Sequence, residues 1–228
     1  MIKAVFIDYT GTLMQENSHY AMLIAKLVAD NSTISNVKDV VKIWFELFLN
    51  LESQVNPQIE DTFMTEDEIL VKAFAIFKRK YNVEVEQDKF ISLMHEFWSK
   101  SPMFEDVKSF FEKCELPIYV ITNNAIEYVS TFMSDNNLYC AGIISGSLVK
   151  AYKPHKEIFE KALEISGCKA DEVIHVGDSI DSDINGAIAA GIFPLLLDRN
   201  GKNKSEQYPV CKSLIEVLEF LNRCNKLI

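Results

Sequence analysis

The chain of 228 residues carries 33 acidic and 23 basic side chains, which gives a formal net charge of -10. A surface with this balance lacks the basic footprint of nucleic-acid-binding proteins, so we expect no nucleic-acid partner. Hydrophobic residues make up 48% of the sequence, enough for a substantial core, yet no segment offers the ~20 consecutive apolar residues that span a bilayer, and we expect no membrane partner.

An apolar run at residues 2–7 predicts a buried strand, and it ends directly on Asp8. A loop that contains Thr10 and Gly11 follows. Open α/β sheets bind ligands outside the carboxyl ends of their strands, and a glycine there lets backbone amides approach an anion. Asp8 is therefore a candidate nucleophile or metal ligand. The plain alternative is an aspartate that only caps a turn.

The segment after this loop has apolar residues at helical spacing and no strand pattern. Thr65 and Glu68 have the spacing of a capping box at the start of its third helix. We therefore expect a helical insertion over residues 15–100. The expected helices cover residues 19–29, 37–51, 67–81 and 87–100.

The second of these helices, residues 37–51, is apolar on nearly all sides. Such a helix is usually buried, so the prediction is packing inside the insertion and against the rest of the protein. A pocket wall for an apolar substrate and a dimer contact are the alternatives. A monomer and a homodimer therefore both stay open.

After the insertion, helical and strand patterns alternate to the end of the chain. Right-handed crossovers between such strands give a parallel sheet with helices on both faces. The expected helices are residues 104–114, 126–134, 154–166, 182–190 and 213–224, and the expected strands are residues 118–121, 142–145, 173–176 and 194–197.

Chemically useful side chains stand at the ends of these elements. Thr122 ends one strand, Lys153 precedes a helix, and Asp178 follows another strand. A phosphoryl group in transfer carries charge on three oxygens, so cations and hydrogen-bond donors stabilise it, and Lys153 and Thr122 supply such groups. The carboxylates of Asp8 and Asp178 can hold a hard cation such as Mg²⁺.

These residues together resemble the four signature motifs of the haloacid dehalogenase-like (HAD) hydrolase superfamily. The motifs are D-x-x-x-T from Asp8, a strand-terminal Thr at Thr122, a Lys before a helix at Lys153, and G-D-S-x-x-x-D, which ends on Asp183. Four motifs in the right order make this a specific resemblance, and only the insertion falls outside it.

The resemblance implies an α/β fold with a Rossmann-like parallel sheet in the strand order 3-2-1-4-5. The catalytic core would then comprise residues 1–14 and 101–228. Residues 15–100 would form the helical C1 cap of HAD subfamily I, inserted directly after the first strand.

The resemblance also implies roles at the site. Asp8 would form an aspartyl-phosphate and ligate Mg²⁺, together with the backbone carbonyl of Thr10 and the carboxylate of Asp178. Asp183 would hold either a metal-bound water or Lys153. The residues expected to bind the phosphate are Thr122, Asn123 and Lys153.

One position departs from the usual pattern of the family. Phosphatases of the superfamily carry a second Asp two residues after the nucleophile, as general acid and base, and this chain has Thr10 there. Threonine cannot exchange a proton near neutral pH. The pattern D-x-T-G-T is that of the P-type ATPases, whereas phosphonoacetaldehyde hydrolases carry Ala and haloacid dehalogenases Tyr at this position. A membrane pump is excluded because this chain is short and has no membrane-spanning segment.

Three functions remain open. The leading one is a Mg²⁺-dependent phosphatase that acts on a small phosphorylated metabolite through an aspartyl-phosphate. The second is a hydrolase of the same fold for carbon–halogen or carbon–phosphorus bonds, the former working without metal and the latter with a cap lysine. The third is a catalytically weak phospholigand-binding protein, because Thr10 replaces the usual acid. The sequence does not identify the substrate.

The remaining polar candidates have simpler interpretations. The five cysteines are odd in number and form no C-x-x-C pair, so reduced thiols and a cytoplasmic location are expected. The apolar run at residues 2–7 is too short for a signal peptide. His175 is read as a packed sheet residue, and no zinc site is expected. Asp181 is read as a solvated carboxylate at a helix start.

Overall fold

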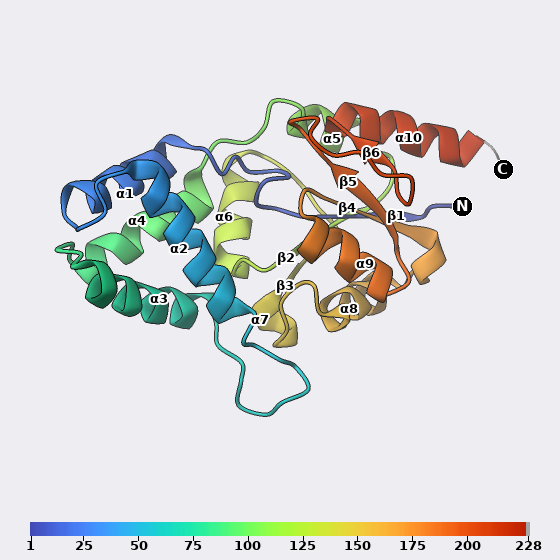
Figure 1. Ribbon diagram of the computed structural model, residues 1–228. Helices are drawn as coiled ribbons and strands as arrows, with labels where there is room; N and C mark the ends of the chain where they lie inside the picture. The colour runs from blue at the N-terminus through green and yellow to red at the C-terminus, as the bar shows by residue number, and fades with distance from the viewer. Residues whose placement is uncertain (227–228) are drawn as a thin grey trace. The chain divides into compact units, whose positions relative to one another are not determined.

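Figure 1 shows the computed structural model of the protein, which describes residues 1–226. The chain forms two compact units, one of residues 1–15 with the segment from Met103 onward, the other of residues 16–102. The sequence predicts the insertion to begin at residue 15 and end at residue 100, within two residues of these bounds. No helix among the described residues is long and apolar enough to cross a membrane.

The first unit is built on a parallel sheet whose strand order, within residues 1–226, is β3-β2-β1-β4-β5-β6. The first five positions confirm the predicted order. The sequence does not predict β6, because a two-residue strand is too short to show a strand pattern. The strands are β1 (Ala4–Ile7), β2 (Ile118–Thr122), β3 (Gly142–Ser145), β4 (Val173–Gly177), β5 (Phe193–Leu197) and β6 (Val210–Cys211).

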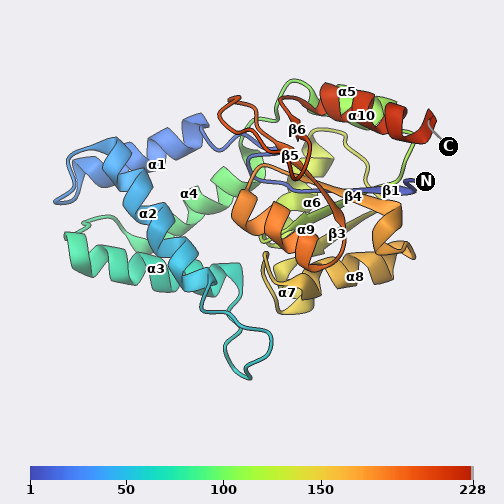
Figure 2. The same cartoon turned by 45° about the vertical axis from the view of Figure 1, so that its right-hand side comes forward.

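Helices cover both faces of this sheet. In Figures 1 and 2, α5 (Val107–Lys113) and α10 (Leu214–Lys226) lie together on one side, and α8 (Lys156–Ser166) and α9 (Asn185–Ala189) lie on the other. Side chains of α8 and α9 pack in one buried cluster with the alternate residues Ala4 and Phe6 of β1 and with Val173 of β4. The remaining helices of the unit are α6 (Ile126–Asp135), α7 (Gly146–Val149) and two short turns, Ala170–Glu172 and Ile180–Ile184.

The sequence predicts a helix from residue 104, but α5 begins only at Val107. The preceding residues pair with the loop after β1. Phe104 N donates to the carbonyl of Leu13 at 3.1 Å, and Met14 and Met103 form an antiparallel bridge. These contacts hold the chain extended, so the helix cannot start earlier.

The second unit is a bundle of helices with an aromatic core. Phe74 stacks on Phe90 at a centroid distance of 4.3 Å, and Trp44 meets Phe90 edge-on at 4.8 Å. The predicted capping box is present, because Glu68 N donates to Thr65 Oγ1 and Thr65 N donates to the Glu68 carboxylate. The helices are α1 (His19–Asp30), α2 (Val37–Glu52), α3 (Glu66–Tyr81) and α4 (Gln87–Lys100).

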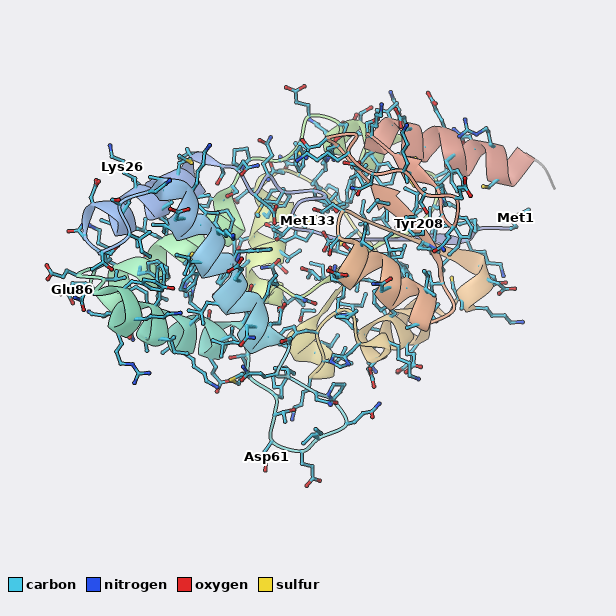
Figure 3. The ribbon with its side chains drawn as sticks, viewed as in Figure 1. Met1, Lys26, Asp61, Glu86, Met133 and Tyr208 are labelled. Carbon is cyan, nitrogen blue, oxygen red and sulfur yellow. The ribbon has the colours of Figure 1, made fainter. Side chains whose placement is uncertain are left out.

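The prediction that α2 is buried is wrong for one side of the helix. Val41, Phe45 and Leu49 follow one another at four-residue spacing, and they are 45%, 53% and 44% exposed. Within the unit, α2 packs against α1 and α3, and its aromatic side chains also contact Phe90 and Trp98 of α4. The loop from α2 to α3 carries Asp61 at its tip, as Figure 3 shows.

Candidate active site

The sheet brings the ends of three strands to one place. β1 lies between β2 and β4, so the residues that follow these strands are neighbours. Asp8 follows β1, and its backbone N donates to the carbonyl of Val176 on β4 at 2.9 Å. Carboxylate oxygens of Asp8, Asp178 and Asp183 all lie within 4.8 Å of one another. Three residues predicted from two separate motifs therefore form one cluster.

Lys153 joins this cluster from the loop before α8. Its Nζ lies 2.5 Å from Asp8 Oδ1 and 2.6 Å from Asp183 Oδ1, and its side chain is 3% exposed. Asn123 fixes the backbone of the lysine: its Oδ1 accepts from Lys153 N at 2.7 Å, and its Nδ2 donates to Lys153 O at 3.3 Å. The sequence predicts that Asn123 binds phosphate. In the structure its side chain holds the backbone of Lys153 in place.

Asp183 is held by donors on both of its oxygens. Oδ1 accepts from Lys153 Nζ and lies 2.9 Å from His175 Nε2, while Oδ2 accepts from Ser179 N at 3.1 Å. Of the two predicted roles for Asp183, the structure shows the contact with Lys153. Asp181, in the same turn, is exposed.

Gly177 makes the close approach of Asp183 possible. A Cβ at Gly177 would lie 2.2 Å from Asp183 Cγ. Gly177→Ala is therefore expected to displace the buried carboxylate and to lower the free energy of unfolding by ~1–3 kcal/mol, the usual cost of overpacking. Urea denaturation measures this change. Wild-type stability together with wild-type activity would contradict the tight contact.

Thr10 and Thr122 are linked through Asn124. Thr10 Oγ1 donates to Asn124 Oδ1 at 2.7 Å, and Thr122 Oγ1 donates to the same oxygen at 3.2 Å. Asn124 N in turn donates to Thr122 Oγ1 at 3.0 Å. The sequence assigns Asn124 no role, because its place after a strand says nothing about a contact with Thr10, 114 positions away.

Burial and the charged neighbours have opposite effects on the pKa values of this cluster. Burial raises the pKa of Asp8 to about 7, although the Lys153 ammonium opposes this shift. Burial also disfavours the ammonium of Lys153, but the carboxylates of Asp183 and Asp8 outweigh it and keep the pKa of Lys153 above its ordinary value. The pKa of Asp183 lies below its usual range, because Lys153 and His175 outweigh the effect of burial.

The residues present fit a divalent cation. Asp8 Oδ2 is buried and has no hydrogen-bond partner within the described chain. Gly11 leaves room for Asp178, since a Cβ there would lie 2.4 Å from Asp178 Oδ2. Thr12 Oγ1 also contacts Asp178 Oδ1, at 3.4 Å. Clustered carboxylate oxygens of this kind are the ligands that Mg²⁺ prefers.

A family model of the haloacid dehalogenase-like hydrolases matches residues 2–191. The chain belongs to this family. The match runs from the first strand through α9 and so includes all the candidate site residues of this HAD-like hydrolase. No curated protein is a significant sequence match for it.

Solved structures of HAD proteins share its fold. The HAD-hydrolase YfnB from Bacillus subtilis, bound to magnesium, has a TM-score of 0.79 at 19% identity, with 97% of this chain and 99% of that chain covered. L-2-haloacid dehalogenase from Xanthobacter autotrophicus has a TM-score of 0.79 at 15% identity over 97% and 99% of the two chains. A HAD phosphatase from Thermococcus onnurineus has a TM-score of 0.67 at 19% identity over 96% and 98%. At these identities the likeness shows the fold alone.

Proposed function

We propose that this HAD-like hydrolase is a Mg²⁺-dependent phosphatase that acts on a small phosphorylated metabolite through an aspartyl-phosphate at Asp8. The supporting observation is the buried Oδ2 of Asp8, which has no hydrogen-bond partner among residues 1–226. Three carboxylates and one ammonium, counted over the described cluster, leave two negative charges when all are ionised. A divalent cation balances that charge.

The residues of the cluster divide the work of phosphoryl transfer. Mg²⁺, when bound, would be held by Asp8, Asp178 and the Thr10 carbonyl, and it would neutralise charge on the phosphoryl oxygens. The Asp8 carboxylate would attack phosphorus in line with the leaving group. Lys153 would donate to the phosphoryl oxygens as their charge builds. The Thr122 hydroxyl would do the same once its hydrogen turns away from the side chain of Asn124.

Two observations favour this reaction over the other hydrolases of the fold. A dehalogenase works without metal, and the carboxylates of Asp8, Asp178 and Asp183 would then exceed the single Lys153 ammonium with no divalent cation to balance the excess negative charge. A phosphonatase needs a cap lysine for its Schiff base, which calls for a depressed pKa and hence burial. Every lysine of residues 16–102 is exposed, including Lys26, Lys38 and Lys42.

The test is a substrate screen run with Mg²⁺ and with EDTA. We expect release of phosphate from an aryl phosphate with Mg²⁺, loss of that activity in EDTA, and no halide release from 2-chloropropionic acid in either buffer. Halide release in EDTA would establish the dehalogenase instead. Saturable binding of phosphorylated compounds without turnover would establish the phospholigand-binding protein.

Replacing Asp178 separates metal binding from the chemistry. Loss of a residue that only supports a metal ligand typically lowers metal affinity by ~10–100-fold. Because Asp178 would bind the metal directly, Asp178→Ala is expected to raise the Mg²⁺ concentration needed for half-maximal activity by more than this. Activity titrated against Mg²⁺ concentration measures this. Asp181→Ala is the matched control, because its carboxylate is exposed in the same segment, and it should keep the wild-type titration. An unchanged Mg²⁺ dependence in Asp178→Ala would remove Asp178 from the metal site.

A further inference from the structure

His175 lies at the centre of β4 and is fully buried. Its ring meets Phe159 of α8 edge-on at a centroid distance of 4.9 Å, and its Nε2 lies 2.9 Å from Asp183 Oδ1. Nδ1 is buried and has no hydrogen-bond partner in the part of the chain that the structure describes. The ring is thus packed like an apolar side chain and makes one polar contact.

The hydrogen-bond chemistry assigns the proton of this ring. Asp183 stays ionised beside the Lys153 ammonium, and an ionised carboxylate only accepts hydrogen bonds. Nε2 must therefore carry the hydrogen that it donates to Asp183. Burial lowers the pKa of His175 despite Asp183, so the ring is neutral and Nδ1 is left as a bare acceptor. A leucine or phenylalanine would fill this site without that unpaired nitrogen, so packing alone does not explain a histidine.

The Nε2–H hydrogen bond acts on Asp183, and Asp183 also binds Lys153. Asp183 Oδ1 accepts from both His175 and Lys153, and Lys153 spans from that same oxygen to Asp8 Oδ1. Without the His175 donor, Asp183 Oδ1 would have only Lys153 as its donor among the contacts described above. Ser179 N would still donate to Oδ2. The ammonium would then be drawn toward Asp183 and away from the nucleophile.

We propose that His175 is a positioning residue, which fixes the Asp183 carboxylate through Nε2–H and so keeps the Lys153 ammonium at Asp8. The inference rests on the proposed function, because it assigns Lys153 to the transferring phosphoryl group. Interactions that matter mainly in the transition state affect kcat more than KM when they are lost. The role therefore makes a kinetic prediction that packing alone does not.

The test compares His175→Leu with His175→Gln. The side-chain amide of glutamine can place an N–H donor close to the position of the His175 Nε2. Leucine has no donor and fills the buried site with apolar atoms. We expect His175→Leu to lower kcat for an aryl phosphate by ~10–100-fold with little change in KM, the range seen for residues that orient ligands of a site. His175→Gln should recover most of the loss. Thermal unfolding should show both variants folded, and His175→Phe replaces the leucine variant if that fails.

A second readout does not depend on turnover. In metal-free protein labelled at its lysine side chains, the NMR signal of Lys153 should shift in His175→Leu and stay near its wild-type position in His175→Gln. Equal kinetic losses in the two variants, or wild-type kcat with an unmoved Lys153 signal in His175→Leu, would overturn the positioning role. If the wild-type protein hydrolyses no phosphate ester, the proposed function fails, and the NMR comparison still decides the role of His175.

Discussion

Asp8→Asn is expected to lower kcat for an aryl phosphate by roughly 10⁴–10⁶-fold, the loss that follows removal of a catalytic nucleophile. Asparagine has the shape of aspartate, but its amide is no nucleophile toward phosphorus. The amide also leaves Lys153 with Asp183 as its remaining carboxylate partner, since Asp8 Oδ1 supplies the other contact. Steady-state kinetics with Mg²⁺ present measure the loss.

The control for this variant is Asp181→Asn, which removes an exposed carboxylate two residues from Asp183 and should leave kcat unchanged. Trapping adds an independent check, because denaturation during turnover should leave acid-stable, base-labile phosphate on the wild-type protein and none on Asp8→Asn. Substantial activity in Asp8→Asn, after contaminating phosphatase has been excluded, would show that Asp8 is not the nucleophile.

The core of the fold is predictable because its signals are local and its topology is constrained. Apolar runs mark β1, β2 and β4, and right-handed crossovers leave few ways to order them. Asp8, Thr122 and Asp178 converge because each stands at the carboxyl end of one of these neighbouring strands. The elements that escape prediction are those fixed by tertiary pairing: β6 has only two residues, and α5 starts late because Phe104 is bonded to the loop after β1.

The candidate site shows the same division. The family motifs identify Lys153 and Asp183, and the contact between them is one of the two roles predicted for Asp183. The other contacts of the site are not predicted. Asn124 meets Thr10 across 114 positions, and no pattern in either segment signals that contact. His175 has the sequence context of a packed sheet residue, and it is one. Its second role arises because the turn at Ile180–Ile184 folds Asp183 back against Gly177 and onto the ring.

The exposed stripe on α2 escaped prediction for another reason. Apolar residues on all sides of a helix indicate burial only where neighbours exist on all sides, and the neighbours of α2 in its unit, which are α1, α3 and α4, leave one side of it exposed. Periodicity reports which faces are apolar and does not report how many partners there are. Val41, Phe45 and Leu49 are therefore apolar and exposed together.

The chemistry at Thr10 has a measurable consequence in the wild-type protein. Its hydroxyl hydrogen is committed to Asn124 Oδ1 at 2.7 Å, and threonine has no carboxylate to take up a proton. General acid–base catalysis contributes typically ~10²–10⁴-fold, and its loss slows both the departure of poor leaving groups and the hydrolysis of the aspartyl-phosphate. We expect acyl and aryl phosphates to be turned over faster than alkyl phosphates, with a burst of leaving group in the first turnover.

Thr10→Asp restores a carboxylate at this position and is expected to raise steady-state turnover of alkyl phosphates and to remove the burst. The gain is bounded by the ~10²–10⁴-fold that general acid–base catalysis supplies. Asn124 must turn its amide to face the new carboxylate, because Asn124 Oδ1 now accepts from Thr10. Thr10→Asn is the matched control, since it has the shape of aspartate and exchanges no proton, and it should show no gain. A folded, Mg²⁺-binding Thr10→Asp variant that is no faster than Thr10→Asn would mean that another group already transfers the proton, or that phosphoryl transfer is not the reaction of this site.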